Sequence, residues 1–355
     1  MPKIKNSVGL VKRVPHFISK RRGMYTMERN ERVDDFEKKI LTKIFKNINS
    51  FDLRTYPTLD NIYLKLAKWL KVKEENLLLT EGADGGLLKI FSTYMEPNSR
   101  FLTLTPGFLM YPVYCSMFKS KCYEINLNEN SQKSYFQNLK KEIKNKRPHI
   151  LALANPNQPM EVYLDKKQIE DICIQTKKIN CLFVLDEAYF HFNNLTGIKL
   201  IKKYENLVVV RTFSKAFGLA GIRVGYLISN KKIINDIKSI KPIYEINGIN
   251  VKIIDFFLKN LSIMKKYVSE VNKSRKIIKK KLKKYNVKIF GDKSNTVMLK
   301  FLKIKDAKPL YEKLLKNKFL TKPVKVDNND NYLRVTLGST AITSKFTNKL
   351  ISLIK

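Results

Sequence analysis

The segment TFSKAFGLAGIRVGY, residues 212–226, carries a lysine and an arginine in a setting that favours chemistry. Lys215 lies among small and apolar neighbours, and a lysine that loses hydration is deprotonated more easily, so its amine can act as a nucleophile or form a Schiff base. Arg223 follows among glycines, whose backbone can approach a ligand closely, and an arginine there suits a phosphate group. The segment predicts a phosphate-bearing cofactor beside a reactive lysine. The alternative is that Lys215 is one of the chain's many surface lysines.

A second candidate is the carboxylate that ends the apolar run CLFVL, residues 181–185. Asp186 follows this run, and Glu187 and Tyr189 come soon after it. A carboxylate at the C-terminal end of a buried strand loses its hydration unless a cation pairs with it. Asp186 is therefore a stronger functional candidate than an acidic residue on the surface.

Residues 77–95, LLLTEGADGGLLKIFSTYM, have the pattern of a strand, a glycine-containing turn and a helix. Asp84 stands where the helix N-cap is expected, after Gly82 and Ala83. A tight turn that feeds a helix N-terminus presents backbone N–H groups to an anion, although an ordinary strand-to-helix turn has the same pattern. The turn lacks the lysine of a P-loop and the glycine spacing of a Rossmann fingerprint, which disfavours ATP and NAD.

Two further strand ends carry residues that could contact a ligand. Residues 100–111 form an apolar run that stops at a Pro-Gly pair before Phe108, whose ring could stack on a flat cofactor or pack in the core. Residues 149–160 form a buried run that ends in a turn rich in amides and prolines. Like Lys215 and Asp186, these candidates follow the ends of expected strands.

Alternating strands and helices must position these candidates. Strands are expected near residues 77, 101, 150, 183 and 208. Their alternation with helices predicts a mostly parallel α/β sheet whose ligand sites lie at the carboxyl ends of the strands. After about residue 245 the pattern changes to long basic amphipathic helices and then to a smaller α/β part. We expect an N-terminal arm at 1–45 that packs with the small domain, a large domain at 46–245 and a small domain at 246–355.

Composition and charge narrow the class of protein. Hydrophobic residues make up 44% of the 355 residues, which is typical of a globular chain. The chain has 69 Lys+Arg against 31 Asp+Glu, a net charge of +38, which either favours anionic partners or reflects lysines on solvated faces. Because the lysines are spread along the chain and do not alternate with aromatics, we expect no nucleic-acid partner.

Cysteine, histidine and apolar content exclude further classes. The four cysteines form no CxxC pair and only three histidines are present, so we expect no metal site. Free thiols are typical of a reducing cytoplasm, and the N-terminus lacks the apolar core of a signal peptide. No apolar run reaches about 18 residues, so we expect a cytoplasmic protein with no membrane-spanning helix.

In their combination and order, these motifs resemble those of the class I/II aminotransferases of fold type I, nearest the histidinol-phosphate aminotransferase group. The resemblance runs from about residue 25 to the end of the chain. It implies an α/β fold of the fold type I PLP-dependent transferases, with a large domain built on a mostly parallel central sheet and a smaller α/β C-terminal domain. It also implies pyridoxal 5′-phosphate (PLP) as the cofactor.

The resemblance implies a role for each residue around the cofactor ring. Lys215 in TFSKAF would hold PLP as a Schiff base and would then serve as the general base. Asp186 in DEAY would pair with the pyridinium nitrogen, and a nitrogen that stays protonated makes the ring an electron sink. Tyr189 would form a hydrogen bond to the ring O3′, and Phe108 would stack on the ring where relatives often have tyrosine.

The resemblance also implies how the cofactor phosphate is held. Ala83 and Asp84 would contact it from one turn, and Ser214 and Arg223 from another. Tyr56 in LRTYP matches a tyrosine that reaches the phosphate from the neighbouring subunit. A homodimer with shared active sites is therefore implied.

The substrate contacts implied by the resemblance include one departure from the family. Arg334 in NYLRVTLGS matches the arginine that binds a substrate carboxylate through two parallel hydrogen bonds, and Asn30 matches an asparagine near that carboxylate. The family motif NPNNPTG appears here as NPNQPME, residues 155–161. The amide contact to the cofactor O3′ would therefore come from Gln158 or from Asn157.

A second departure concerns Lys322, which stands where histidinol-phosphate aminotransferases have a second arginine. Lys322 would bind a phosphate as a point charge and not as a fork. We expect an aminotransferase that moves the amino group of a donor such as glutamate to a small, phosphorylated carbonyl acceptor. Two alternatives stay open: a PLP-dependent decarboxylase of a phosphorylated amino acid, which would use the same residues, and a non-enzymatic nucleic-acid binder, which the net charge permits.

Overall fold

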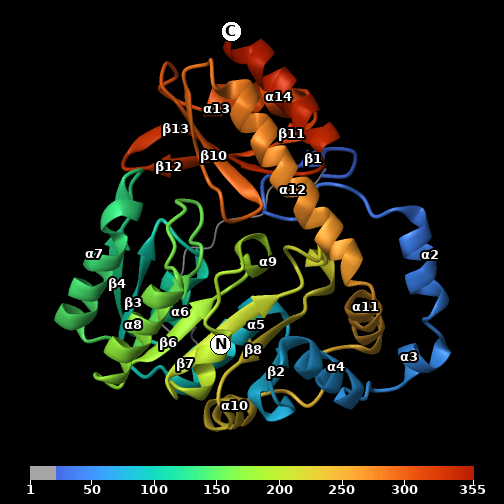
Figure 1. Cartoon of the computed structure of the whole chain (residues 1–355), viewed down its shortest axis with the longest axis vertical. Helices are drawn as coiled ribbons and strands as arrows, with labels where there is room; N and C mark the ends of the chain where they lie inside the picture. The colour runs from blue at the N-terminus through green and yellow to red at the C-terminus, as the bar shows by residue number, and fades with distance from the viewer. Residues whose placement is uncertain (1–20) are drawn as a thin grey trace, which may run out of the picture.

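The computed structural model of the chain describes residues 21–355, which form two α/β parts (Figure 1). One part is built around a seven-stranded sheet and lies below in Figure 1, and the other is built around a four-stranded sheet and lies above it. The first 20 residues of the predicted N-terminal arm lie outside the described residues. The domain limits predicted at 1–45, 46–245 and 246–355 stay a prediction.

The larger sheet has the strand order β2-β8-β7-β6-β5-β3-β4. Its strands are β2 (Leu77–Thr80), β3 (Arg100–Thr105), β4 (Lys121–Asn126), β5 (Ile150–Ala154), β6 (Leu182–Asp186), β7 (Leu207–Thr212) and β8 (Gly225–Ile228). The strands from β7 to β4 run parallel, whereas β8 lies antiparallel between β2 and β7. The predicted mostly parallel sheet is confirmed, with a strand at each of the five expected places.

Sequence patterns do not predict β4 and β8. β4 is the edge strand, most of its side chains are exposed or half-buried, and it therefore lacks the apolar run of a central strand. β8 is only four residues long and follows directly on the segment that carries Lys215 and Arg223. Because β8 begins with a glycine, the sequence pattern assigns it to the glycine-containing segment before it.

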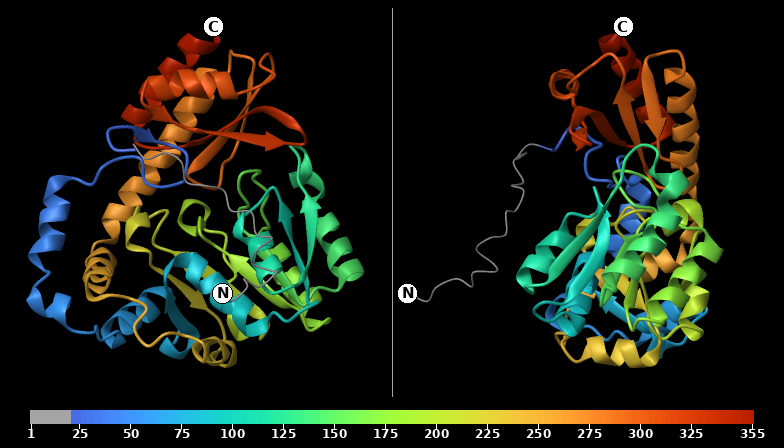
Figure 2. Two further views of the ribbon diagram at one scale, coloured as in Figure 1. Left: turned by 180° about the vertical axis from the view of Figure 1, so that it is seen from behind. Right: turned by 90° about the vertical axis from the view of Figure 1, so that its left-hand side faces the viewer.

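Helices cover both faces of the larger sheet (Figures 1 and 2). They are α4 (Asp60–Leu70), α5 (Gly82–Tyr94), α6 (Met110–Met117), α7 (Ser131–Lys146), α8 (Lys166–Lys177), α9 (Phe190–Asn193), α10 (Lys231–Lys238) and α11 (Gly248–Lys259). Successive strand residues point to opposite faces, so Leu78 packs with the apolar residues of α5, α6 and α10 whereas Leu77 and Leu79 pack on the other face. β5 and β7 are buried along their whole length, as expected for parallel strands covered on both faces.

The smaller sheet is antiparallel and has the strand order β12-β13-β10-β9. Its strands are β9 (Val287–Phe290), β10 (Thr296–Phe301), β12 (Lys322–Val326) and β13 (Asn329–Thr336). The helices that lie around it are α12 (Leu261–Leu282), α13 (Lys308–Lys316) and α14 (Thr340–Ile354). The long helix α12 begins beside α11 in the lower part and ends beside α14 in the upper part, so that it connects the two (Figures 1 and 2).

The first described residues also belong to the upper part. β1 (Tyr25–Thr26) pairs in parallel with β11 (Phe319–Leu320), and the Met27 backbone bonds to Leu320 and to Thr336. From there the chain descends through α2 (Lys38–Lys46) and α3 (Ser50–Arg54) to α4 (Figure 1). None of the helices in residues 21–355 has both the length and the apolar character needed to cross a bilayer.

Candidate active site

A cavity of about 620 Å³ lies at the carboxyl ends of the parallel strands, between the two parts of the molecule. Its lining comes from the ends of β5, β6 and β7, from the start of α5, from residues 29–31, and from β12 and β13. The predicted site residues in this lining are Asn30, Ala83, Asp84, Phe108, Gln158, Asp186, Tyr189, Ser214, Lys215, Arg223, Lys322 and Arg334. The fold therefore brings together residues that are far apart in the sequence.

The ends of two neighbouring strands place Lys215 and Asp186 in the cavity. Burial lowers the pKa of Lys215 to about 8, with a further contribution from the charge of Arg334. Burial also raises the pKa of Asp186 to about 7, although the Ala188 N–H donates to its Oδ1 at 2.9 Å. Both side chains are therefore closer to their neutral forms than they would be in water.

Tyr189 and Asn30 are joined directly inside the cavity. The Asn30 side chain donates to the Tyr189 hydroxyl at 2.6 Å, and the Asn30 backbone N–H donates to Thr336 Oγ1 at 3.0 Å. Asn30 has a left-handed φ of 58°, a conformation that asparagine adopts more readily than most residues. Burial raises the pKa of Tyr189, so its hydroxyl keeps its proton at neutral pH.

The start of α5 forms a cradle with the segment after β7. Gly82 and Arg223 both have left-handed φ values, of 75° and 51°, and a Cβ on Gly82 would lie 2.8 Å from Arg223 Nη2. No side chain caps α5, so its first backbone N–H groups are available to an anion. The Arg223 guanidinium lies 2.9 Å from Asp84 Oδ2, and Ser214 Oγ accepts a hydrogen bond from Thr212 Oγ1 at 3.0 Å.

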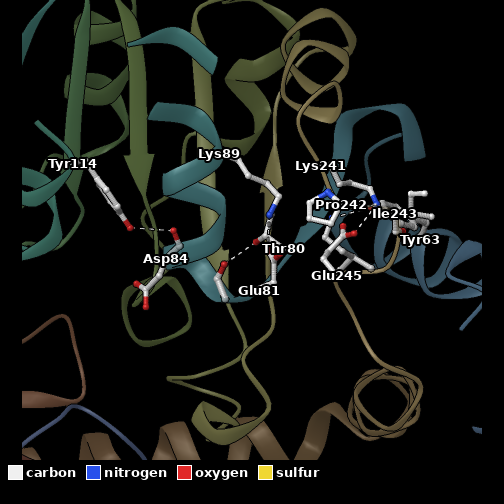
Figure 3. Close-up of polar contacts among 12 residues, drawn as sticks. Tyr63, Thr80, Glu81, Asp84, Lys89, Tyr114, Lys241, Pro242, Ile243 and Glu245 are labelled. Atoms are coloured by element: carbon white, nitrogen blue, oxygen red, sulfur yellow. Dashed lines mark hydrogen bonds and ion pairs between the residues drawn. The ribbon is translucent and has the colours of Figure 1, made fainter. Parts of the chain in front are cut away.

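Neighbouring side chains hold this start of α5 in place, as Figure 3 shows. The Tyr114 hydroxyl of α6 donates to the Asp84 carbonyl at 3.2 Å, and Lys89 bonds to Glu81 at 2.5 Å. The same view shows Lys241 bonded to Glu245 at 2.6 Å, which orders the chain after α10. The cradle is therefore supported from outside the cavity by groups that would not contact a ligand.

Phe108 and Gln158 line the cavity, but Asn157 is not among its lining residues. Asn157 is buried, and its amide donates to the carbonyls of Pro106 (2.9 Å) and Met160 (2.8 Å). Phe108 lies edge-on to the Tyr111 ring, with 5.2 Å between the ring centroids. Of the two amides that the sequence offers for a cofactor contact, only Gln158 reaches the cavity.

A group of cations forms the wall of the cavity that the upper part contributes. Lys322 and Arg334 are paired on β12 and β13, and Arg29 joins them from the N-terminal segment. Burial lowers the pKa of Lys322, and the charges of Arg334 and Arg29 lower it further. Arg334 Nη2 donates to the Glu28 carbonyl at 2.6 Å, whereas its buried Nε has no hydrogen-bond partner in the described part of the chain. An unpaired buried guanidinium N–H suits an anionic ligand.

Sequence reasoning missed Arg29 and Glu31, which flank Asn30 and also line the cavity. The available signal was the charged run ERNER itself, residues 28–32, but no pattern within it shows which side chains face a ligand. Tyr56 lies apart from the cavity lining of this chain. It is 73% exposed and stacks on Tyr244, with 4.0 Å between the ring centroids.

A family model for class I and II aminotransferases matches residues 24–350. The chain belongs to this family. It is 30% identical to the histidinol-phosphate aminotransferase of Clostridium novyi (strain NT) over 316 residues. This match covers 88% of this chain and 87% of that protein. The predicted resemblance is thereby confirmed, and the chain is a PLP-dependent aminotransferase.

Solved structures show the same fold. Histidinol-phosphate aminotransferase from Sinorhizobium meliloti, in complex with pyridoxal-5′-phosphate, has a TM-score of 0.87 at 19% identity and covers 99% of each chain. L-threonine-O-3-phosphate decarboxylase from Porphyromonas gingivalis has a TM-score of 0.78 at 21% identity, over 93% of this chain and 99% of that one. These likenesses confirm the fold type I prediction.

The residues of the cavity fit PLP, the cofactor of this aminotransferase. The start of α5 and Arg223 provide N–H donors and a cation for a phosphate, and Lys215 is a buried amine with a lowered pKa. Asp186 is a buried carboxyl to which no cation of residues 21–355 is bonded, so a ring N–H placed there would stabilise its charge. The described residues contain no group of three or more metal-ligating side chains that could compete for this role.

Proposed function

We propose that this aminotransferase takes the amino group of glutamate, or of a similar amino acid, and delivers it to a small phosphorylated carbonyl compound. The observation that carries this proposal is the wall of three cations, Arg29, Lys322 and Arg334, in the same cavity as Lys215. One carboxylate needs only one arginine fork, so further cations favour a second anionic group on the acceptor. The relatives named histidinol-phosphate aminotransferases support a phosphorylated acceptor.

The lower part of the cavity would bind the cofactor. Ala83, Asp84, Ser214 and Arg223 would hold its phosphate, because they form the cradle at the start of α5. When bound, PLP draws electron density from the substrate Cα and so makes the proton on that carbon acidic. Phe108 would contact the flat face of the ring.

Asp186 and Tyr189 would set the electronic state of the cofactor. The Asp186 carboxylate would accept a hydrogen bond from the ring nitrogen, which keeps that nitrogen protonated. The Tyr189 hydroxyl would donate to the ring oxygen O3′, and the bond from Asn30 to Tyr189 would orient it. Asn30 is thereby placed between the cofactor side and the substrate side of the cavity.

Lys215 would move the proton that transamination requires. Its neutral amine would take the proton from the substrate Cα, because a pKa of about 8 leaves a larger neutral fraction near neutral pH than an ordinary lysine has. The ammonium would then give the proton to the cofactor carbon that is bonded to the transferred nitrogen. Lys215 would also hold the cofactor covalently between turnovers.

Arg334 would bind the donor carboxylate through two parallel N–H···O bonds, one of them from its unpaired Nε. Lys322 and Arg29 would bind the phosphate of the acceptor. The two substrates would then use one site in turn, because the donor product leaves before the acceptor enters. Charge on the cavity wall, and not a shaped apolar pocket, would select both substrates.

A second copy of the chain would complete the site. Phe51, Leu53, Tyr56, Ile243 and Tyr244 are apolar or aromatic and more than half exposed. Tyr56 and Tyr244 stack on each other in a groove of about 450 Å³. An exposed cluster of this kind marks an interface, and Tyr56 would reach the cofactor phosphate of the partner from it. We therefore propose a homodimer with two shared sites.

Separate measurement of the two half-reactions tests the proposed activity. With glutamate alone, the absorbance spectrum of the cofactor should change in one turnover, and a phosphorylated carbonyl acceptor should restore it. Phosphorylated amino acids should release no CO₂. If glutamate, alanine and aspartate all leave the spectrum unchanged while a phosphorylated amino acid releases CO₂, the enzyme is a decarboxylase and the proposal is wrong.

A further inference from the structure

The turn after β5 is bonded to the segment between β9 and β10, residues 291–295, which belongs to the other sheet. The Gln158 amide nitrogen donates to Ser294 Oγ at 2.9 Å and to Glu161 Oε2 at 3.3 Å. The Gln158 amide oxygen accepts from Thr296 Oγ1 at 2.8 Å. The side chain of Gln158 therefore bridges the two parts of the molecule, with Glu161 from its own turn beside it.

Glu161 holds the backbone of the same segment. Its carboxylate accepts from the Asp292 N–H at 2.5 Å and from the Lys293 N–H at 3.0 and 3.1 Å. Arg275 of α12 donates to the Ser294 carbonyl, so that a cation and a carboxylate bond to one short segment. Ser294 itself is fully buried. Asn295 is buried as well, whereas Asp292 is exposed. A segment with a buried end that is bonded by charged groups from separate elements has one preferred position.

The bonds of Gln158 use all of its donors. A primary amide has two N–H groups, and here they are directed to Ser294 and to Glu161. Because the Glu161 carboxylate only accepts, it also fixes which end of the Gln158 amide is the nitrogen. Asn157 uses both of its N–H groups on the carbonyls of Pro106 and Met160. Neither amide has an N–H left for a cofactor.

The segment is also connected to the strand that carries Arg334. Thr296, the first residue of β10, pairs with Thr336 of β13, and the Leu337 N–H donates to the Asn295 carbonyl at 2.8 Å. The Asn295 side chain donates to the Asn30 carbonyl at 3.1 Å. A displacement of the segment would therefore displace Arg334 and Asn30 relative to the larger sheet.

We propose that Gln158 and Glu161 form a clasp on residues 291–295 and that Gln158 is a positioning residue and not a ligand of the cofactor. The clasp fixes the strand that carries Arg334 relative to Lys215, which follows β7 of the larger sheet. It acts on the donor, because the donor must contact both Arg334 and Lys215. It acts in the same way whichever carbonyl compound is the acceptor, so its test is independent of the acceptor's identity.

Substitution on either side of the clasp tests it. Gln158→Ala, on the cavity side, and Ser294→Ala, which lies outside the cavity lining, both remove the hydrogen bond between these two side chains. Each should speed amide hydrogen exchange at residues 291–296 of the holoenzyme by at least about three- to tenfold, the effect expected from losing that bond. Each should raise KM for glutamate by a similar factor. The dissociation constant of PLP, measured by titrating the cofactor-free protein, should change by less than about twofold.

A double variant and a matched control complete the test. Gln158→Ala with Ser294→Ala should have less effect than the sum of the two single changes, because each of them already removes the bond between the two side chains. Gln132→Ala removes an amide that also bonds to a neighbouring turn, through the Tyr163 backbone, but does not reach the segment, so it should change none of these quantities. The proposal is overturned if Gln158→Ala weakens PLP binding by about tenfold and leaves amide hydrogen exchange at residues 291–296 unchanged. That result would show that Gln158 is a cofactor ligand.

Discussion

Burial shifts the two central ionisable groups of the cavity in opposite directions. The pKa of Lys215 is lowered to about 8 and that of Asp186 is raised to about 7, in each case because the charged form loses hydration. Within residues 21–355 neither group forms an ion pair, so both shifts persist. A cofactor that brings a ring N–H to Asp186 and an electrophile to Lys215, as proposed, would relieve both costs together.

Replacing Lys215 by Ala should abolish the covalent attachment of the cofactor and lower turnover by at least about a hundredfold, since it would also remove the proposed general base. Borohydride reduction of the wild type followed by peptide mass spectrometry should find the cofactor-derived mass on the peptide with Lys215. Exposed Lys231 provides the control, and Lys231→Ala should keep both properties. A label on any other lysine would contradict the assignment of Lys215.

Asp186 should make the stability of the cofactor-free protein depend on pH. The folded protein keeps this proton up to about pH 7, whereas an unfolded chain releases it near pH 4, so the free energy of unfolding falls as pH rises through this window. The side chain of the Asp186→Asn variant does not titrate. The free energy of unfolding of this variant minus that of the wild type should therefore be larger at pH 7 than at low pH, by roughly 1–4 kcal/mol. Denaturant unfolding at both ends of the window measures this, and parallel curves would contradict it.

Replacing Arg334 by Lys should impair the donor half-reaction selectively. The lysine keeps the charge but loses the two parallel hydrogen bonds to a carboxylate, which should cost roughly 1–3 kcal/mol of transition-state stabilisation. The half-reaction with an acceptor that lacks a carboxylate should lose less. Stopped-flow absorbance of each half-reaction provides the comparison, and equal losses in both would show that Arg334 does not distinguish the substrates.

Among the elements, β8 and the start of α5 approach each other closely. Gly225 begins β8 so close to the turn before α5 that a Cβ on it would lie 2.6 Å from the Ala83 nitrogen and 2.7 Å from the Arg211 carbonyl oxygen. Only glycine allows this approach. The antiparallel strand β8 therefore sets the position of the helix N-terminus to which the cofactor phosphate is proposed to bind.

The variant Gly225→Ala should weaken PLP binding and lower the free energy of unfolding by roughly 1–3 kcal/mol, because backbone atoms must move away from the new methyl group. Gly221→Ala is a matched control four residues earlier, where a Cβ would meet nothing within 4 Å. PLP titration and thermal unfolding of both variants make the comparison. Similar behaviour of the two variants would mean that close packing at Gly225 is unimportant.

The sequence predicts the parallel strands other than the edge strand β4, and the positions of Lys215, Asp186 and Phe108, because apolar runs mark buried strands and their ends mark the ligand side of a parallel sheet. It does not predict β8, whose strand begins at a glycine, or the approach of Arg29 to Lys322. That approach depends on a pairing between β1 and β11, which no local pattern encodes. Motif resemblance supplied Arg334 and Asn30, whereas their environment came only from the packing of the two sheets.

At the scale of the whole molecule, the exposed apolar cluster should hold two chains together. Ile243 is 78% exposed, and Ile243→Glu would place a charge within the proposed interface. The variant should sediment as a monomer. It should also bind PLP more weakly, because a monomer lacks the contact from the partner's Tyr56. Tyr56→Phe should remain a dimer but bind PLP more weakly by about 1 kcal/mol, one hydrogen bond. A fully active wild-type monomer would contradict both the interface and the shared site.

The pairing of β1 with β11 has a consequence for how the protein is made on the ribosome. β1 emerges first, but its partner strand is synthesised almost a full chain length later. At roughly 5–20 residues per second, the N-terminal segment waits many seconds without its partner. The larger sheet can form in that interval, since its strands lie between the two. Asn30 and Arg29 can take their places in the cavity only after β11 has been released, so catalytic competence arises no earlier than that.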